Sequence, residues 1–480
     1  MTNNVFQKRT ISPLESRVER KAAGAERWIK SHIFLSIVMI ILGLLTLRGI
    51  VGAIRTGDPF SVSQIMLSAV GNGLETDSYG HTNILLLGIG GEGHDGANLT
   101  DTMMVASLDS SDNTVSIISV PRDIYTENDE VGFGTKLNSI YEYVLDKTES
   151  PTAAAAEVQK EIENILGVKI QYYAKIDFQG FTEIVDALGG ITVDVKEAIA
   201  DTSYPSDSLT GSVWDPFYLS AGVQDLDGET ALKYARSRHT TSDYDRAARQ
   251  QEVIAAIKDK ALSAGVLGSP SKIKAIYFAI TDNFETNLSL SELLELAGEA
   301  EDIEKDSISS TVITEEANKQ GGFLYAGERE EGDPFYLVPY AGDFSETEAF
   351  TQLFFYHPEV FRNKVPVEVL NGTREDSLAG LTKMYLVRRG IDASFGNALA
   401  KGQADTIICM PEGVSEADKE AANSVLNILP SMTFGEIKSE CPNGYSLLER
   451  PTEAKIIIIL GDDFATYYHE HENLFYLGFY

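Results

Sequence analysis

The sequence predicts an α/β protein with a large mixed sheet flanked by helices, one apolar segment before it and a small α/β domain after it. Three observations support this fold class. Strand and helix patterns alternate after about residue 80, an uncharged apolar run lies near the N-terminus, and a second alternating set begins near residue 364. A chain of 480 residues is long enough for two or three domains with their own cores.

The N-terminal segment has the pattern of a signal anchor. Ile33–Leu47 contains no charged residue, and the apolar character continues to Ile54 with Arg48 near the interface. Residues 1–30 hold seven basic and three acidic side chains, so the positive-inside rule places them in the cytoplasm. We expect a cytoplasmic basic tail (1–30), a transmembrane helix (31–54) and an extracytoplasmic stem (55–80). A cleaved signal peptide is the alternative, but the charged leader is long and lacks a clear small-residue cleavage site.

This topology predicts a single-pass protein of the cell membrane whose C-terminal bulk is extracytoplasmic. The region 81–302 then forms the main domain, in which period-two apolar runs alternate with amphipathic stretches. We expect strands at Asn83–Ile89, Met103–Leu108, Val115–Val120, Ile170–Ile176 and Ile191–Val195. We expect helices at Asn138–Lys147, Pro151–Leu166, Phe178–Leu188, Gly228–Tyr234 and Asp245–Ser263.

Residues 303–363 show no clear helical period, so we expect a connecting region there. A small α/β domain is predicted at 364–465, followed by a tail at 466–480. Its strands are predicted at Val365–Leu370, Thr406–Met410 and Ala454–Leu460, and its helices at Asp376–Arg389 and Ser415–Leu429. The two cysteines, Cys409 and Cys441, both fall in this domain, and the sequence leaves their pairing open.

The charge of the chain argues against a nucleic-acid partner. It has 39 basic and 72 acidic residues, for a net charge of −33. A duplex-binding domain presents a broad basic face, whereas the field of this chain repels a polyanion outside one focused site.

That site is predicted where the basic residues gather. Arg236 and Arg238 share one face if their segment is extended, and Arg246, Arg249 and Gln250 share one face of a helix. Guanidinium groups bind phosphate oxygens bidentately and keep their charge, so this cluster suits two adjacent phosphoryl groups.

A glycine-rich loop follows the first predicted strand. Gly88-Ile-Gly90-Gly-Glu-Gly93 matches a dinucleotide-binding pattern, but no helix is expected after Gly93, which argues against a nicotinamide cofactor. The loop leads to Asp101, which is suited to Mg²⁺ with Asp95 or Glu92 nearby, because Mg²⁺ takes one or two carboxylates plus substrate phosphates. A turn-capping role for Asp101 is the alternative.

Two further basic residues lie close to strand or helix ends. Arg122 and Asp123 end a strand of apolar residues, at the kind of sheet edge where α/β proteins bind ligands. Arg122 pairing with a neighbouring carboxylate is the structural alternative. Lys136 and Asn138 are further predicted substrate contacts, with a simple helix cap as their alternative.

The ordered set of motifs resembles the LytR-CpsA-Psr (LCP) family of bacterial cell-envelope proteins over most of the region after the membrane segment. The residues that carry the resemblance are Asn83–Gly88, Thr100–Thr102, Ser119–Asp123, Lys136–Asn138, Asp186–Ile191, Tyr234–Arg238 and Asp243–Gln250. The second domain, with Val369–Gly372 and the apolar strand before Gly461, resembles the LytR-type C-terminal domain attached to such proteins.

The resemblance implies a transferase that moves an anionic glycopolymer from a polyprenyl-pyrophosphate carrier onto peptidoglycan through a phosphodiester. It implies that Arg122, Arg236, Arg238, Arg246 and Gln250 hold the pyrophosphate. Asp101 would bind Mg²⁺, Asp243 would orient the arginines, and apolar helix faces would cover the lipid tail. Lys136, Asn138 and Arg249 complete the predicted substrate contacts.

This sequence departs from the family pattern at two positions. Gly90 and Leu99 stand where an Asp and an Arg are commoner, so the metal site needs another ligand, with Glu92 and Asp95 as the choices. Two other functions compete with transfer. One is a non-enzymatic scaffold that binds polyprenyl phosphates or wall polymers, and the other is hydrolysis of the carrier pyrophosphate. Transcriptional regulation is disfavoured, because the short cytoplasmic tail contains no helix-turn-helix.

Overall fold

The computed structural model describes residues 73–475 with several gaps. The gaps are 95, 205–213, 238–248, 251, 254–255, 258–259, 261–282, 290–291, 293–294, 297–298, 300–302, 304–306, 331, 412–413, 434, 439–440 and 442–452. The predicted tail and transmembrane helix, most of the stem and most of the helix predicted at Asp245–Ser263 therefore lie outside the described residues. Within the described part of the chain, no helix is long and apolar enough to cross a bilayer.

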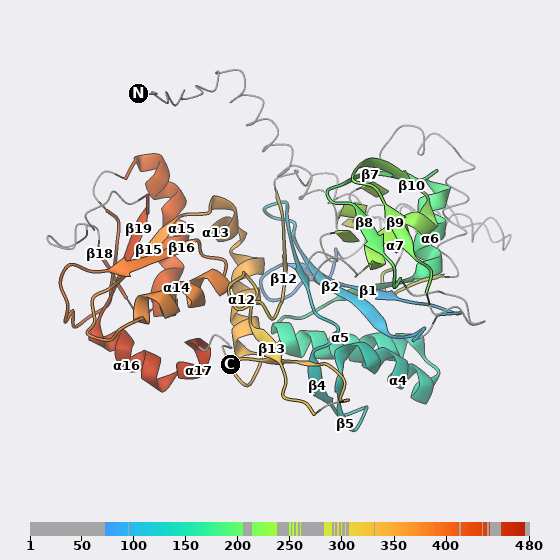
Figure 1. Cartoon of the computed structure of the whole chain (residues 1–480), viewed down its shortest axis with the longest axis horizontal. Helices are drawn as coiled ribbons and strands as arrows, with labels where there is room; N and C mark the ends of the chain where they lie inside the picture. The colour runs from blue at the N-terminus through green and yellow to red at the C-terminus, as the bar shows by residue number, and fades with distance from the viewer. Residues whose placement is uncertain are drawn as a thin grey trace, which may run out of the picture.

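A six-stranded mixed sheet forms the centre of the main domain, in the order β11-β6-β1-β2-β3-β12 (Figure 1). Its strands are β1 (Thr82–Ile89), β2 (Thr100–Asp109), β3 (Thr114–Ser119), β6 (Tyr172–Asp177), β11 (Phe284–Thr286) and β12 (Ile308–Val312). The pairs β1–β6 and β3–β12 are parallel, whereas β1–β2, β2–β3 and β6–β11 are antiparallel. The mixed α/β sheet expected from the sequence is thus confirmed.

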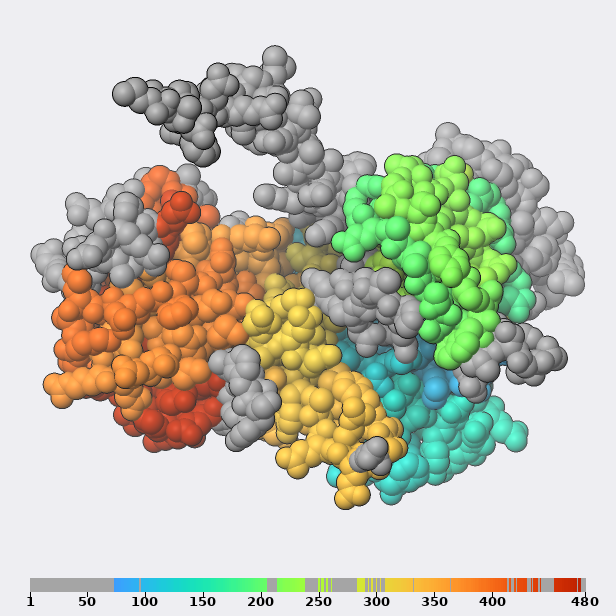
Figure 2. Space-filling model, in the orientation of Figure 1, coloured from blue at the N-terminus to red at the C-terminus, as the bar shows by residue number. Residues whose placement is uncertain are grey.

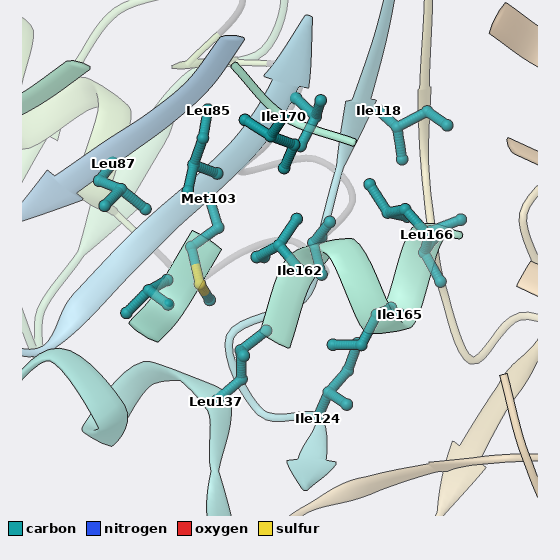
Figure 3. Close-up of a cluster of buried hydrophobic side chains, with 14 of the residues drawn as sticks. Leu85, Leu87, Met103, Ile118, Ile124, Leu137, Ile162, Ile165, Leu166 and Ile170 are labelled. Atoms are coloured by element: carbon teal, nitrogen blue, oxygen red, sulfur yellow. The ribbon is translucent and has the colours of Figure 1, made fainter. Parts of the chain in front are cut away.

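Helices cover both faces of this sheet, because the side chains of its central strands alternate between two cores. On β1, Ile84 contributes to one core and Leu85 to the other. The first face is covered by α6 (Phe178–Ala187) and α7 (Gly228–Arg236), and the second by α4 (Ile140–Thr148), α5 (Pro151–Leu166) and α12 (Ser345–Tyr356). Figure 3 shows the second core, where Leu85, Leu87 and Met103 of the sheet meet Ile162, Ile165 and Leu166 of α5.

Shorter elements surround this frame. They are the hairpin β4 (Tyr125–Asn128) with β5 (Phe133–Lys136), the 3-10 turn Leu137–Ser139, the pair β7 (Ile191–Val195) with β10 (Gly222–Leu226), the pair β8 (Ile199–Asp201) with β9 (Phe217–Leu219), and the pair β13 (Leu324–Ala326) with β14 (Leu337–Pro339). The pairs β7–β10 and β8–β9 lie on the side of the sheet that carries α6 and α7 (Figure 1).

The C-terminal domain is a second α/β unit around a five-stranded sheet, in the order β16-β15-β19-β17-β18. Its elements are α13 (Pro358–Asn363), β15 (Val367–Asn371), α14 (Leu378–Arg388), β16 (Ala393–Asn397), β17 (Ile407–Cys409), α15 (Glu416–Thr433), β18 (Glu436–Lys438), β19 (Ile456–Leu460), α16 (Asp462–Glu470) and α17 (Glu472–Phe475). Cys409 and Cys441 form a disulfide, with their Cα atoms 5.1 Å apart.

The segment 303–357, which we expected to be part of a connecting region, is built into the main domain, and the rest of that region forms α13 of the C-terminal domain. Its β12 extends the central sheet, and Phe350 and Phe354 of α12 belong to the core beside α5. The α12 pattern was not recognised because this helix is buried on more than one side, which removes the polar stripe that marks an amphipathic helix. Figure 2 shows the yellow surface of this segment between the orange C-terminal domain and the cyan elements of the main domain.

Candidate functional site

The candidate site lies at the edge of the central sheet where β1, β3 and β6 end and β2 begins. The register places Gly88 beside Thr102 and Met104 beside Ser119, so the residues that follow β1 and β3 come close to the start of β2. Residues 90–94 and 96–99 form a loop of turns rather than a helix. This loop approaches the end of β6 closely, since a Cβ added to Gly91, at φ +83°, would lie 2.9 Å from the Cβ of Asp177.

A chain of alternating charges runs along this edge. Arg122 Nη1 donates a short hydrogen bond to Asp101 Oδ1, and Arg122 Nε lies 3.4 Å from Asp123 Oδ2. Lys136 Nζ donates to Asp123 Oδ1 at 2.7 Å. The charges of the two carboxylates and the two cations cancel. Ion pairs therefore hold these four side chains in place, but the four together add no net positive charge to the site.

Backbone contacts from Asn138 hold this charged chain in place. The Asn138 amide donates to the carbonyl of Arg122 at 3.1 Å, and its carbonyl accepts the Thr100 hydroxyl at 3.2 Å. The side chain of Asn138 is buried, and its Oδ1 has no hydrogen-bond partner among the described residues. Asn138 therefore links the turn that carries Arg122 to the start of β2, which carries Asp101.

Arg236 is the charged group on the other side of the site. Arg236 is the last residue of α7, so its backbone is helical. The extended conformation that we considered for the segment from Arg236 to Arg238 therefore does not hold at Arg236. Its guanidinium carbon lies 4.1 Å from the ring centroid of Phe178 and 5.5 Å from that of Tyr204, and Nη1 donates to Tyr204 Oη at 3.1 Å. These aromatic contacts and the hydrogen bond to Tyr204 thus contribute to the direction of this guanidinium.

The two neighbouring residues of the arginine cluster lie differently. Arg249 is 8% exposed and donates from Nε to the carbonyl of Tyr234 at 3.1 Å and from Nη2 to the carbonyl of Ser237. Its guanidinium therefore caps the C-terminal end of α7, whereas we expected it to contact substrate. Gln250, by contrast, faces the site and lines both of the cavities described next.

Two adjoining cavities open at this edge. The apolar cavity, of ≈ 150 Å³, lies between the sheet and helices α6 and α7 and has Arg236 in its wall. Its apolar wall is formed by Leu86, Leu87, Ile89, Met104, Ala174, Ile176, Phe178, Phe181, Leu232, Ala235, Val253 and Phe284. Asp177 also lines this cavity, and burial raises the pKa of its carboxyl group.

The polar cavity, of ≈ 100 Å³, contains Asp101, Arg122 and Asp123. It shares Thr102, Met104 and Gln250 with the apolar cavity, so the two are neighbours along β2. Lys136, Asn138, Arg249 and Glu92 line neither cavity. The predicted site residues Arg238, Asp243, Arg246 and Asp95 lie outside the described residues.

Comparison with known proteins identifies the family. The sequence profile of the LytR_cpsA_psr family matches residues 55–334. The chain belongs to the LytR-CpsA-Psr family. The profile described as LytR cell envelope-related transcriptional attenuator matches residues 364–464, in agreement with a LytR-type C-terminal domain.

Individual members of the family are similar over the main domain. The chain is 33% identical over 219 residues to the polyisoprenyl-teichoic acid–peptidoglycan teichoic acid transferase TagU of Enterococcus faecalis, covering 45% of this chain and 64% of that protein. It is 29% identical over 244 residues to TagV of Bacillus subtilis, covering 50% and 56%. The crystal structure of B. subtilis TagV aligns with 58% of this chain and 98% of its own, with 26% identity and a TM-score of 0.43. The chain thus spans less than two thirds of the length of these two curated relatives.

The family resemblance implies Mg²⁺, and the described residues fit it only in part. Asp101 presents one oxygen to Arg122, and its Oδ2 makes no hydrogen bond among the described residues, so one carboxylate oxygen is open to a metal. Gly90 supplies no carboxylate, and Glu92 lies exposed in the loop. No cluster of three or more His, Cys, Asp or Glu side chains within the described ranges could hold a metal ion by itself.

Several residues of this LCP site were not found from the sequence. The position of Phe178 in the sequence could have indicated its role, because it directly follows the strand that ends at the site. A side chain at that position must face either the helix or the cavity. Tyr204 stands alone in a polar stretch, and no local pattern marks its contact with Arg236. Ser119, Phe335 and Leu337 line the polar cavity, and the latter two come from the segment that lacked a recognisable pattern.

Proposed function

We propose that this chain transfers a glycopolymer from a polyprenyl-pyrophosphate carrier to peptidoglycan, forming a phosphodiester. The observation that carries the proposal is the pairing of the two cavities. An apolar cavity meets a charged one at Thr102, Met104 and Gln250, with Arg236 on the first side and Arg122 on the second. An isoprenoid pyrophosphate has the same division, with an apolar tail joined directly to a doubly phosphorylated head.

The residues act mainly through position and charge. Arg236, held by Phe178 and Tyr204, would bind pyrophosphate oxygens at the mouth of the apolar cavity, together with Arg238 and Arg246. An acceptor hydroxyl would form a new bond to the phosphorus that carries the polymer. The bond from that phosphorus to the carrier phosphate breaks, polyprenyl phosphate leaves, and the hydroxyl proton leaves with the phosphate. Fixed cations offset the charge that develops on the leaving phosphate.

Mg²⁺ belongs to the proposal as a metal that binds together with the substrate. The open Oδ2 of Asp101 and pyrophosphate oxygens would hold it, with Asp95 or Glu92 as a further ligand, and it would offset charge on the phosphoryl groups. Calorimetric titration of the chain with a short polyprenyl pyrophosphate tests this. Mg²⁺ should tighten binding in the natural protein but not in Asp101→Asn, and equal Mg²⁺ effects in both proteins would remove Asp101 from the metal site.

We also propose that residues 31–54 anchor the chain in the cell membrane with residues 55–480 outside the cytoplasm. The disulfide Cys409–Cys441 supports this placement, because such bonds persist in oxidising compartments. The carrier is a membrane lipid, so an anchored chain would keep its apolar cavity close to the substrate. Protease treatment of intact spheroplasts should digest the C-terminal domain, and protection of that domain until the membrane is lysed would contradict the topology.

The activity itself is tested by reconstitution. The chain is mixed with Mg²⁺, a polyprenyl-pyrophosphate-linked saccharide and peptidoglycan oligomers, and phosphodiester-linked product is followed by mass spectrometry. Arg236→Ala and Arg238→Ala should each lower the rate at least tenfold, since loss of a contact that stabilises the transition state costs a few kcal/mol. Arg362→Ala, an exposed arginine of α13 in the other domain, is the matched control and should retain the natural rate.

The same reaction separates the competing functions. Release of saccharide phosphate without linked product, with every acceptor tried, would favour a pyrophosphate hydrolase. Tight lipid binding with no chemistry in the natural protein would favour a scaffold.

A further inference from the structure

The two edges of the C-terminal sheet, β16 and β18, differ in charge (Figure 1). The edge strand β18 carries Glu436 and Lys438 on either side of Ile437. Charged side chains commonly protect a sheet edge from pairing with a further strand. The opposite edge strand β16 has the sequence Ala-Ser-Phe-Gly-Asn, and no charged residue occurs between Asp392 and Lys401. The edge at β16 therefore lacks this protection.

The backbone of β16 directs hydrogen-bonding groups towards its outer side. Two hydrogen bonds at the ends of the parallel pairing show that the even-numbered residues of β16 face β15. The Asp392 carbonyl accepts from the Val367 amide at 2.8 Å, and the Ala398 amide donates to the Asn371 carbonyl at 3.1 Å. Because the direction of these groups alternates along a strand, the amides and carbonyls of the odd-numbered residues point to the open edge. These residues are Ala393, Phe395 and Asn397.

An exposed aromatic side chain lies at the middle of this edge. Phe395 is 56% exposed, and its ring lies against α14 at Gly380, where an added Cβ would be 3.6 Å from Cε2 of the ring. Leu399, which follows the strand, is 64% exposed. Single exposed apolar side chains are common, but these two lie beside a row of outward-facing backbone groups. Such an edge is suited to the addition of another strand.

This edge is complementary to a second copy of itself. In an antiparallel pair with Phe395 at the two-fold axis, Ala393 of each copy lies opposite Asn397 of the other. The outward-facing residues then exchange amide and carbonyl hydrogen bonds, and the two Phe395 side chains lie on the same face with Cα atoms about 5.5 Å apart. The acidic end of one strand, at Asp392, also comes to the same side as the basic end of the other, at Lys401.

We propose that the C-terminal domain pairs two copies of this chain through antiparallel β16 strands, which join the two five-stranded sheets into one. The net charge of −33 opposes self-association in general, so a second copy can approach best at an uncharged, self-complementary edge. An interface of one strand pair is small. The membrane anchor proposed above would raise the effective concentration of the two copies and favour their pairing.

Cysteine cross-linking in membranes tests the arrangement. The two cysteines of the chain are bonded to each other, so Phe395→Cys would introduce the only free thiol. A separation of about 5.5 Å between Cα atoms is within the range that a disulfide spans, so mild oxidation should give a covalent dimer. Ile437→Cys is the matched control, since Ile437 is 42% exposed on the opposite edge strand. Equal cross-linking of both variants, or none of Phe395→Cys, would overturn the proposal.

Asn397→Pro tests whether the outer edge is responsible. The Asn397 amide points away from β15, so proline removes an outward donor and leaves the pairing with β15 intact. Light scattering on the full chain in detergent should show a concentration-dependent dimer for the natural protein and a monomer for Asn397→Pro, at unchanged Tm. Phe395→Lys places like charges opposite each other and should give the same monomer if proline lowers Tm. A dimer that persists in the folded variants uses another surface and contradicts the proposal.

The oligomeric state and the transfer reaction are measured separately, because the pairing does not depend on transfer. A natural protein that transfers polymer but stays monomeric in detergent and in membranes would overturn the pairing and leave the transfer proposal standing. A dimer that depends on β16 in a chain without transfer activity would support the pairing while the transfer proposal fails. Capture of a different protein at β16 by a monomeric chain would also contradict the pairing of two copies.

Discussion

The hydrogen bond between Tyr204 and Arg236 predicts how strongly the donor is bound. Tyr204 is 1% exposed, and its Oη accepts from Arg236 Nη1 at 3.1 Å. Tyr204→Phe removes this hydrogen bond but keeps the ring whose centroid lies 5.5 Å from the guanidinium. Arg236 also keeps Phe178 at 4.1 Å, so the guanidinium should remain over its aromatic support while it loses the hydrogen bond to Tyr204.

The magnitude follows from the type of bond that is lost. A hydrogen bond to a charged group contributes about 1.5–3 kcal/mol, and about 1.4 kcal/mol corresponds to a factor of ten. Because the aromatic contacts remain, we expect the lower end, an approximately tenfold loss of kcat/KM for the polyprenyl-pyrophosphate donor.

Steady-state transfer assays with varied donor and saturating acceptor measure this loss. Tyr218→Phe is the matched control, since Tyr218 is 64% exposed and the same hydroxyl is removed from the surface. The reasoning is refuted if Tyr204→Phe changes donor kcat/KM by less than threefold while Arg236→Ala inactivates the protein. An equal loss in Tyr218→Phe would also refute it, because the effect would then not depend on Arg236.

Two further predictions concern stability. Reduction of the disulfide Cys409–Cys441, or the substitution Cys409→Ser, should destabilise the C-terminal domain by about 2–4 kcal/mol, because the bond closes a loop with a sequence separation of 32. Differential scanning calorimetry should show a lower transition temperature for that domain only. Burial lowers the pKa of His81 below 6.5, although Asp109 and Asp77 oppose the shift. The unfolded chain therefore binds the proton more readily than the folded protein does. The stability that is present above pH 6.5 should be lost as the pH falls below this value. Urea unfolding from pH 7.5 to 5.5 should show this slope, and His81→Gln should reduce it.

Elements with complete local signals could be predicted from the sequence almost to the residue. The helix Pro151–Leu166 has the predicted bounds because Ser150 accepts from the Ala153 amide, Pro151 occupies the first helical position, and Gly167 adopts a left-handed conformation at φ 66°. The strand Ile191–Val195 is also found as predicted, with alternating burial that matches its period-two pattern. Such elements carry their start, stop and orientation in neighbouring residues.

The parts that could not be predicted depend on contacts between distant segments. Arg249 shares a helical spacing with Gln250, yet its guanidinium is directed to backbone carbonyls of α7, and spacing does not distinguish that partner from a phosphate. Ser119 was part of a recognised motif, but its hydroxyl, which has no hydrogen-bond partner among the described residues, is buried only because β12 covers the edge of β3. The sequence could therefore predict which residues gather at the site more reliably than the role of each one.

The segment that walls the polar cavity also holds the C-terminal domain, which links the two domains functionally. Arg389 Nη2 donates to Glu346 Oε1 at 2.8 Å in a pair that is almost fully buried, with side-chain exposures of 7% and 4%. The Arg388 carbonyl accepts from the Gly321 amide at 2.9 Å, and Leu324 donates to the carbonyl of Thr314, which lines the cavity. Contacts thus run from the end of α14 to the cavity wall.

Glu346→Ala tests whether this connection matters. It leaves the buried Arg389 charge uncompensated beside the equally buried Arg388, and such a change costs about 3–5 kcal/mol. We expect that loss in chemical denaturation, and in the protein that remains folded we expect a lower kcat/KM for transfer, because the wall of the cavity that contains Arg122 is loosened. Glu348→Ala, an exposed residue of the same helix, is the control. A lower stability with an unchanged kcat/KM for transfer would mean that the cavity wall is held by the main domain alone, because the loosened interface would then leave the shape of the cavity intact.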